Sequence, residues 1–429
     1  MESTRTGTDP TRGRWPIAAA AVAVQLALGG VYAWSVFNKP LQAEFGWSRS
    51  EAVLPFEVAI GTIFIGTLLG GRIQDRRGPR PVAVAGVVLY SAGIMLASRV
   101  STKDQLWLLV LTYGLIGGIG LGLAYITPIA MLVKWFPDRR GLITGIAVGG
   151  FGFGAVITGP AAKALLARAD NKPSVFLPLG IAYLVVGLVG ASRFRNPPPG
   201  YTVPGFTPKA GTATVGYTLS EALRTPQWYL LTAILFLNTM CGIAFISEAS
   251  DAAEEVALVS ATTAATFVGI MGLFNGGGRI VWAALSDVIG RMPAFLGMLG
   301  LQAVCFLLLP HFHVFAVFAV LGALIYLAYG GGFGTMPATA ADFFGTLNAG
   351  AIYGAMIVAW SAGGVVGPLV AARLYESSGG YTLPFTVLGV VALVSLALPM
   401  LARPPRLLLP VAAEGAVSAP PRSGGPAGP

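Results

Sequence analysis

The sequence predicts an all-α membrane protein with twelve transmembrane helices in two six-helix, pseudo-symmetric bundles. Its 429 residues are 55% hydrophobic and only 10% charged, whereas about 25% of the residues in a soluble domain are charged. Apolar runs recur along the chain, several of them long enough to cross a bilayer, which takes about 20 residues. Glycine is abundant, with 58 residues, as is typical where helices pack closely within lipid.

The first apolar run, 15–37, is interpreted as a span, because it is too long for a secretory signal and has no clear small-residue cleavage site. The twelve predicted spans are 15–37, 52–71, 81–99, 106–133, 140–165, 175–193, 227–247, 261–285, 293–310, 313–336, 348–372 and 381–402. The outer segments, 1–14 and 404–429, are predicted to be short cytoplasmic tails. The second is rich in Pro, Gly and Ala, which indicates disorder.

The longest internal loop, 196–226, divides the chain into two predicted bundles, 15–195 and 227–403. Its run of three prolines and its Gly/Thr-rich part suit a linker better than a packed core. The two halves also share a short repeat, because Asp75 and Asp287 are each followed, after two residues, by a glycine close to a basic residue. Two linked six-span halves are the plan of many secondary transporters, whose site lies at the membrane midplane between the halves.

Twelve spans place both termini on the same side of the membrane. If that side is the cytoplasm, its tails and loops hold eighteen of the 27 Lys and Arg residues, and the opposite loops hold eight. Such an excess is typical of cytoplasmic loops. We therefore expect a multi-pass protein of the plasma membrane, the inner membrane of a bacterium, with both termini cytoplasmic. The net charge of +9 reflects these loops rather than nucleic-acid binding.

One predicted span, 261–285, contains a single charged residue, Arg279. An arginine in hydrocarbon costs roughly 3 to 17 kcal/mol, so it is rarely found there without a partner or a ligand. Its alternatives are to reach toward the cytoplasmic surface or to pair with backbone carbonyl groups. Asn275 lies four residues earlier on the same helix face. Gly276–Gly278 permit close helix packing or local unwinding.

Three stretches of the sequence stand out as motifs. They are Gly71-Arg72-Ile73-Gln74-Asp75-Arg76-Arg77-Gly78-Pro79-Arg80; Lys134-Trp135-Phe136-Pro137-Asp138-Arg139-Arg140-Gly141-Leu142, followed by Gly145 and the pair Gly149-Gly150; and Leu273-Phe274-Asn275-Gly276-Gly277-Gly278-Arg279, continuing to Ser286-Asp287-Val288-Ile289-Gly290-Arg291. The first resembles the signature of the major facilitator superfamily. The second resembles a motif shared by the oxalate:formate antiporter family and the monocarboxylate transporters, and the third resembles the eighth span of the oxalate:formate antiporters. The resemblance runs from the first span to the twelfth and implies a transporter that works by alternating access.

By this resemblance, Arg279 binds a substrate carboxylate, as the matching arginine does in both families. The residue type fits, because a guanidinium can donate two parallel hydrogen bonds to two carboxylate oxygens. Asn275 matches an aspartate of the eukaryotic monocarboxylate transporters. It can form a hydrogen bond with the guanidinium or the substrate, or an interhelical hydrogen bond that joins two helices. Because an asparagine carries no proton, coupling through this position is excluded.

Trp360 aligns with a lysine of the oxalate:formate antiporter, where that lysine balances the second carboxylate of oxalate. With Arg279 as the one cation left in the predicted site, a monoanion fits better, because an unpaired carboxylate in low dielectric is costly. We therefore expect a small monocarboxylate such as lactate, pyruvate or formate. The tryptophan also adds apolar surface, which suits a short aliphatic tail.

Four aromatic residues within the first, fourth and tenth spans match residues that wall the site in the related families. They are Tyr32, Tyr125, Tyr329 and Phe333. The three tyrosines can each offer a hydroxyl group to the substrate. Ordinary packing within the bundle is the alternative for all four.

Five charged residues are candidates for coupling or gating: Lys39, Glu57, Asp75, Arg76 and Arg80. Lys39 resembles an outer-end lysine of the monocarboxylate transporters, and an interfacial lysine is the alternative. Glu57 lies about one and a half turns into the second span, and the alternative is a surface-facing carboxylate. The other three are expected to pair helix ends on the cytoplasmic face and so stabilise an outward-facing state.

The leading hypothesis is proton-coupled symport of a small monocarboxylate, and an oxalate/formate-type anion exchanger is the alternative. The sequence shows no nucleophile–base pair and no phosphate loop, and Cys241 and Cys305 lack metal-ligand spacing, so no enzyme, catalytic residue, metal or cofactor is expected. A membrane sensor would need an output domain, for which the tails are too short. The expected partners are the substrate, the proton and the lipid bilayer, and the protein is expected to be a monomer.

Overall fold

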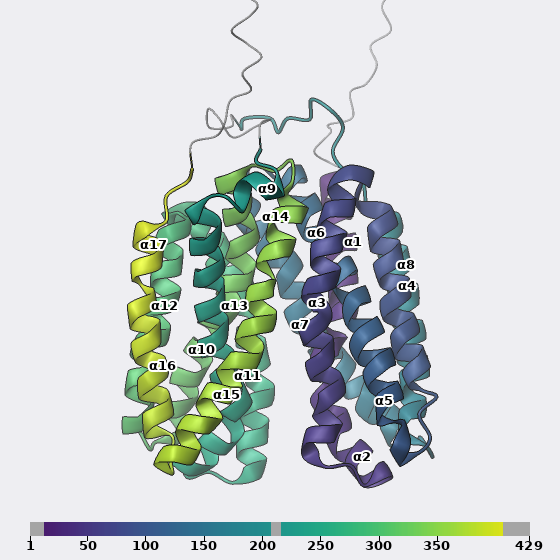
Figure 1. Cartoon of the computed structure of the whole chain (residues 1–429), viewed down its shortest axis with the longest axis vertical. Coiled ribbons are helices and arrows are strands. Elements are labelled where there is room, and N and C mark those ends of the chain that lie inside the picture. The colour runs from purple at the N-terminus through teal and green to yellow at the C-terminus, as the bar shows by residue number, and fades with distance from the viewer. Residues whose placement is uncertain (1–12, 207–215, 406–429) are drawn as a thin grey trace, which may run out of the picture.

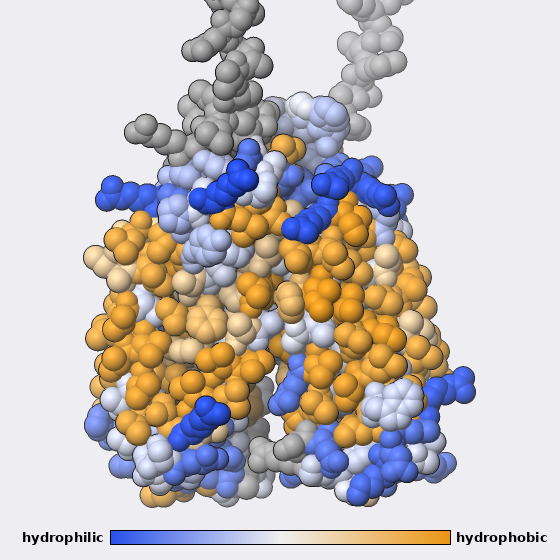
Figure 2. Space-filling model, viewed as in Figure 1, coloured by the Kyte–Doolittle hydropathy of each residue, from blue (hydrophilic) through white to orange (hydrophobic). Residues whose placement is uncertain are grey.

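The computed structural model of the chain describes residues 13–206 and 216–405. All regular secondary structure in these ranges is helical, and 12 helical segments are long and apolar enough to cross a membrane. The predicted all-α membrane fold is therefore confirmed. The helices stand side by side in two groups, one from each half of the chain (Figure 1). On the face shown in Figure 2, a broad apolar band extends across both groups and is bordered by hydrophilic ends.

The first group contains the first six spans. Its segments are α1 (Arg14–Leu28), η1 (Gly29–Trp34), α2 (Ser35–Phe45), α3 (Arg49–Arg77), α4 (Pro79–Ala97), η2 (Lys103–Gln105), α5 (Leu106–Leu109), η3 (Val110–Gly117), α6 (Gly118–Trp135), α7 (Arg140–Leu166), η4 (Lys172–Val175) and α8 (Phe176–Ser192). Some spans consist of several segments joined end to end. The first combines α1, η1 and α2, and the fourth combines η2, α5, η3 and α6. Of these, η3 is a π-helix and the other η segments are 3₁₀-helices.

The second group contains the last six spans and is preceded by a short helix, α9 (Leu219–Ala222). Its segments are α10 (Pro226–Val256), α11 (Ala261–Ile289), α12 (Arg291–Leu308), η5 (Leu309–His311), α13 (Phe315–Phe344), α14 (Ala349–Met356), α15 (Val358–Ser378), α16 (Thr382–Ser395) and α17 (Ala397–Leu401). We call the end of the bundle at which α1 begins and α17 ends the terminal face. It is uppermost in Figure 1, and the other end is the opposite face.

Two spans extend beyond their predicted bounds, the first at its start and the eighth at its end. The first span begins at Arg14, which the sequence places in the tail. The Arg14 guanidinium pairs with the carboxylate of Asp138 at 2.7 Å and lies 4.5 Å from the ring centre of Phe136. The eighth span continues to Ile289, so that Arg279 is ten residues, or about 15 Å, from its end, whereas the predicted end at residue 285 places it about 9 Å from the end.

The loop predicted as a linker is attached to both groups where the structure describes it. Its early part lies on the first group, where the indole nitrogen of Trp135 donates to the Arg195 carbonyl at 2.7 Å. Its late part lies on the second group, where the Asn348 amide donates to the Tyr217 carbonyl at 2.9 Å. Residues 207–215 lie outside the described ranges, as do most residues of both predicted tails.

Glycines bring the two groups together along two seams. In the first, Gly71 of α3 lies against the carbonyl oxygen of Gly350 in α14. In the second, Gly145 of α7 lies against the carbonyl oxygen of Arg279 in α11. A Cβ atom added to Gly71 would overlap the facing backbone, and one added to Gly145 would press closely upon it. These seams therefore depend on the absence of side chains, which is the reason glycine is used there.

The two aspartates of the sequence repeat make equivalent contacts across these seams. The Asp75 carboxylate of α3 accepts from the backbone nitrogen of Ala351 at 2.8 Å, in the first turn of α14. The Asp287 carboxylate of α11 accepts from the backbone nitrogens of Gly141 and Leu142 at 2.9 and 2.8 Å, in the first turn of α7. Each carboxylate therefore satisfies free backbone donors at the positive end of a helix in the other group.

The remaining polar contacts between the groups also lie at mid-depth or toward the terminal face. There, Arg140 of α7 pairs with Asp342 of α13 at 2.8 Å. At mid-depth, the Ser361 hydroxyl donates to the Ile60 carbonyl at 3.0 Å. The next residue of α3, Gly61, has no atom within 4 Å of an added Cβ, and the surface is indented between the groups at the opposite face (Figure 2). The molecule is therefore closed at the terminal face and open toward the opposite face.

Candidate functional site

Arg279 lies on α11, which touches its neighbours α13 and α7 through glycines. Gly278 lies against the Leu327 backbone and Gly334 against the backbone of Arg279 itself, which draws α13 close to α11. On the other side, Gly276 meets the ring of Phe153 from α7. Gly277 has open space around it. Two of the three consecutive glycines therefore serve close packing within a continuous helix.

The guanidinium of Arg279 is fully buried, with 0% of the residue exposed. Its Nε donates to Oδ1 of Asn275 at 3.3 Å, and its Nη1 donates to the carbonyl oxygen of Val148 in α7 at 3.2 Å. Its Nη2 is buried with no hydrogen-bond partner. Pairing with a backbone carbonyl, one of the expected alternatives, therefore occurs at Nη1 of the guanidinium. It leaves Nη2 without a partner.

Aromatic rings enclose the guanidinium. Its central carbon lies 5.2 Å from the ring centre of Phe333 and 5.7 Å from that of Phe151. Trp360, which is 1% exposed, joins the enclosure from the second group. Ring-centre distances from Trp360 are 5.1 Å to Phe333, 5.9 Å to Phe151, 5.8 Å to Tyr125 and 6.4 Å to Tyr32. Because these rings come from both groups, the enclosure lies on the boundary between them.

Three tyrosine hydroxyls in this region are also buried without a hydrogen-bond partner: those of Tyr32, Tyr125 and Tyr353. The Tyr32 hydroxyl faces the Arg279 guanidinium, and the Tyr125 and Tyr353 hydroxyls face each other, in each case without the geometry of a well-formed hydrogen bond. A buried donor without a partner costs about 1–3 kcal/mol. Four unsatisfied donors close together therefore indicate a place built for something with several acceptor atoms. An anion with two oxygens matches this set of donors.

Tyr329, the remaining predicted wall residue, also belongs to this group, because its hydroxyl faces Tyr32 and interacts electrostatically with Arg279. Its ring packs edge-on against Phe333 at 5.3 Å. Its backbone carbonyl accepts from the buried Asn238 amide at 3.1 Å. The structure thus brings all seven predicted binding residues into one region, with Asn275 and Phe333 in direct contact with Arg279.

Sequence reasoning missed three components of this site, namely Phe151, Tyr353 and the carbonyl group of Val148. Two of them had a visible signal. Phe151 directly follows the glycine pair that closes the second resemblance motif. Tyr353 precedes Trp360 by seven residues, which is two helical turns on one face. The Val148 carbonyl had no signal, because its role depends on how α7 packs against α11.

The predicted coupling and gating residues lie outside this region. Lys39 and Glu57 are exposed in the half of the molecule that opens toward the opposite face. Asp75 belongs to the first seam, between α3 and α14, and also pairs with Lys134 at 3.3 Å. Arg76 and Arg80 are exposed, and neither forms an ion pair within the described ranges.

The helical bundle and its central enclosed cation define a multi-pass membrane protein of the transporter class. The model of the Major Facilitator Superfamily matches residues 19–356 and 251–424. The chain belongs to the Major Facilitator Superfamily, and it is a transporter of that family.

Several known proteins are similar to the chain over most of its length. The uncharacterized MFS-type transporter YhjX of Escherichia coli (strain K12) is 28% identical over 82% of this chain and 86% of its own length. The oxalate:formate antiporter of Oxalobacter formigenes is 26% identical over 94% of this chain and 95% of its own length. Monocarboxylate transporter 12-B of Danio rerio is 24% identical over 84% of this chain and 80% of its own length.

Among solved structures, the fold is similar to that of the fucose:proton symporter FucP of Escherichia coli. The TM-score is 0.69, with 14% sequence identity, and the match covers 90% of this chain and 98% of the symporter. At this level of identity, the likeness concerns the fold alone.

Proposed function

We propose that the protein transports small monocarboxylates such as lactate or pyruvate, and that Arg279 binds the carboxylate. The observation that carries the proposal is the free Nη2 of a fully buried guanidinium among three free tyrosine hydroxyls. A carboxylate placed there accepts from a charged donor, which is among the strongest hydrogen bonds in proteins. The similarity to an oxalate:formate antiporter and a monocarboxylate transporter supports the same class of substrate.

A single negative charge on the substrate matches the charge of the site. In the part of the chain that the structure describes, Arg279 is the one cation within the aromatic enclosure, and Trp360 fills the position that a lysine holds in the antiporter it resembles. A monocarboxylate bound to Arg279 forms a neutral pair in low dielectric. The second carboxylate of oxalate has no cation there, so its burial carries the penalty of an unpaired charge.

Alternating access follows from the two glycine seams. We propose that the terminal face is cytoplasmic, as the excess of Lys and Arg on that side favours, and that the membrane is the inner membrane of a bacterium. The structure then corresponds to an outward-open state. Substrate enters from the opposite face, and release requires the contacts of Asp75 and Asp287 to break as the halves rock.

Proton-coupled symport is the coupling that we propose, and one observation favours anion exchange as a second candidate. In the described ranges, no Asp or Glu contacts Arg279. The loaded site is therefore neutral, whereas the empty site keeps an isolated positive charge in low dielectric. Symport needs a distant proton carrier, such as Glu57, to compensate for this charge. Exchange needs none, because the protein then switches between its outward-open and inward-open states only when an anion is bound.

Uptake into proteoliposomes tests both the function and its coupling. With labelled lactate outside and no internal anion, an imposed inward proton gradient is expected to drive accumulation. Unlabelled formate, acetate, pyruvate and oxalate are added as competitors, and the monocarboxylates are expected to compete better than oxalate. Uptake that requires an internal carboxylate and ignores the gradient would establish exchange. No uptake of any carboxylate under either condition would contradict the proposed function.

Replacing Tyr353 by phenylalanine is expected to raise KM for carboxylate uptake about tenfold or more. The reason is that the change deletes one hydroxyl from the site, and a hydrogen bond to a charged group contributes about 1.5–3 kcal/mol. The measurement is the concentration dependence of initial uptake in proteoliposomes.

Tyr326 provides a matched control for this substitution. Its hydroxyl is also buried without a partner, but its ring packs against Phe245 at 6.0 Å, in a cluster that does not include Arg279. Tyr326→Phe is therefore expected to leave KM unchanged. Equal effects of the two changes would show that Tyr353 acts through general packing and not at the site.

A further inference from the structure

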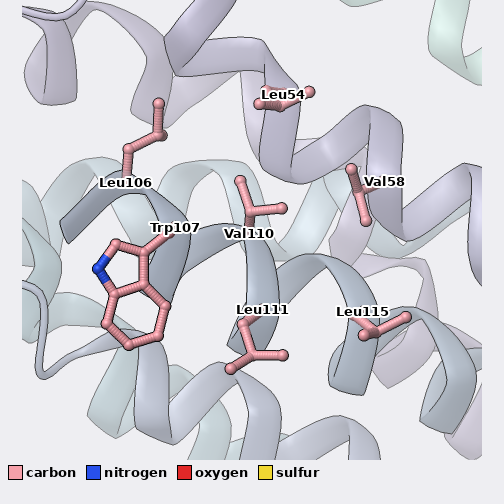
Figure 3. A pocket seen from close by; sticks show the side chains of 7 residues that line it. All are labelled: Leu54, Val58, Leu106, Trp107, Val110, Leu111 and Leu115. Carbon is pink, nitrogen blue, oxygen red and sulfur yellow. The ribbon is translucent and has the colours of Figure 1, made fainter. Parts of the chain in front are cut away.

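A second concave site lies on the side of the first group, away from Arg279. It is an open hollow of about 490 Å³ between α3 and the segments α5 and η3 (Figure 3). Its lining consists of Leu54, Val58, Leu106, Trp107, Val110, Leu111 and Leu115. The volume falls within the range of about 300–1,000 Å³ that is typical of small-molecule pockets. Nothing in the transport function proposed above uses it.

The hollow lies beside the start of a close contact between α3 and the fourth span, which runs along Gly114, Gly118 and Gly122. At Gly114 of η3, an added Cβ would lie 3.0 Å from the Val58 side chain and 3.1 Å from the Pro55 carbonyl oxygen. The Thr62 hydroxyl of α3 lies 3.2 Å from the carbonyl oxygen of Gly114 and 2.8 Å from that of Val58, and its one hydrogen is shared between them. The π-helical backbone of η3 is thus fixed against α3 at Gly114, while nearer the opposite face apolar side chains border an unfilled space.

The position of the hollow shows what surrounds it. Both bordering helices are membrane spans. Trp107 is 63% exposed and lies just after the exposed residues 101–104, as is typical of the aromatic belt at a membrane–water interface. From Leu106 to Leu115 the hollow extends about 13 Å along the helix toward the bilayer centre. Its lining offers one polar atom, the Trp107 indole nitrogen, so water and polar ligands gain almost no hydrogen bonds there.

We propose that this hollow binds one acyl chain of a phospholipid from the leaflet at the opposite face. The chain lies along Val58 and Val110, and the anionic headgroup lies beside Lys103. Lys103 is exposed and forms no ion pair in the described ranges, and the carboxylate that interacts with it electrostatically, that of Glu51, belongs to α3. A second copy of the protein fits less well, because protein–protein interfaces use about 20–30 residues on each side and this lining has seven.

A lipid in the hollow would contact the same helix, α3, that forms the first seam at its other end. α3 borders the hollow near the opposite face and carries Gly71 and Asp75 at the terminal face. A bound chain fills the wedge between α3 and η3 and so fixes the tilt of α3 within its own group. The lipid therefore acts as a structural ligand of the first group.

The test is to fill the hollow with a larger side chain and to measure how much phospholipid remains bound to the protein. The protein is reconstituted in vesicles with equal parts of phosphatidylethanolamine and phosphatidylglycerol, extracted in mild detergent and weighed by native mass spectrometry. Val110→Phe is expected to lower the fraction that retains one phospholipid about tenfold, because the added ring occupies the space of the chain. Val185→Phe is the matched control. It adds the same ring to another lipid-facing valine, 56% exposed on α8 and outside the hollow, and is expected to match the wild type.

A second measurement places the lipid beside Trp107. Brominated acyl chains in the same vesicles are expected to quench the Trp107 signal, defined as the wild-type fluorescence minus that of Trp107→Phe, and Val110→Phe is expected to reduce this quenching. Equal lipid retention in Val110→Phe and Val185→Phe would overturn the proposal. So would a dimer in the wild type that Val110→Phe alone dissociates, because the occupant would then be a second copy.

Discussion

Replacing Arg279 by alanine is expected to abolish carboxylate uptake, with a loss in kcat/KM of at least about a hundredfold. Two charge-assisted hydrogen bonds disappear together with the one cation that neutralises the substrate, and such bonds contribute about 1.5–3 kcal/mol each. The variant is expected to fold, because deleting a buried charge also removes its desolvation penalty. The measurement is initial uptake of labelled lactate by proteoliposomes that contain equal amounts of each protein.

Arg279→Lys separates charge from geometry. Lysine keeps the positive charge but lacks the planar fork that grips two oxygens at once, so partial activity with a raised KM is expected. Arg77→Ala serves as a control for the loss of a cation, since Arg77 is exposed at the end of α3. Full uptake by Arg279→Ala would eliminate both symport and exchange of carboxylates as the function of this site.

The transmembrane architecture could be predicted from the sequence because it depends on local composition. A bilayer requires apolar runs of a set length, and these can be read directly from the residues. The contact between Arg279 and Asn275 was predictable for a similar reason, since a spacing of four residues fixes them on one helix face. The ends of the spans could be predicted less well. Arg14, for example, begins the first helix and pairs with Asp138, a distant residue whose contact the local sequence does not show.

Contacts between the halves could not be predicted in the same way. The repeat of Asp75 and Asp287 is visible in the sequence, but their acceptance of backbone donors from α14 and α7 depends on the docking of the two groups. The pairing of Asp342 with Arg140 depends on this docking too. Phe151 and Tyr353 were overlooked because buried aromatic residues are common in helices, and only their positions around Arg279 distinguish them from ordinary packing.

Replacing Gly71 by alanine is expected to lower transport about ten- to a hundredfold without unfolding the protein. The new methyl group overlaps the carbonyl of Gly350 in the other half, and overpacking of this kind costs about 1–3 kcal/mol. Because the clash occurs only when the terminal face is closed, the cost shifts the equilibrium away from that state. Weaker closure should expose the backbone nitrogen of Ala351, which donates to Asp75, so hydrogen–deuterium exchange in α14 is expected to accelerate.

Gly61→Ala is the control, because Gly61 lies on the same helix with nothing within 4 Å of an added Cβ. Both changes raise the intrinsic helix propensity of α3 equally, so a difference between them reports the seam alone. Gly61→Ala is expected to keep wild-type uptake and exchange. If Gly71→Ala also keeps both, the α3–α14 contact does not restrict closure, and the terminal face must be held shut by the second seam, where α7 meets α11 and Asp287 accepts from Gly141 and Leu142.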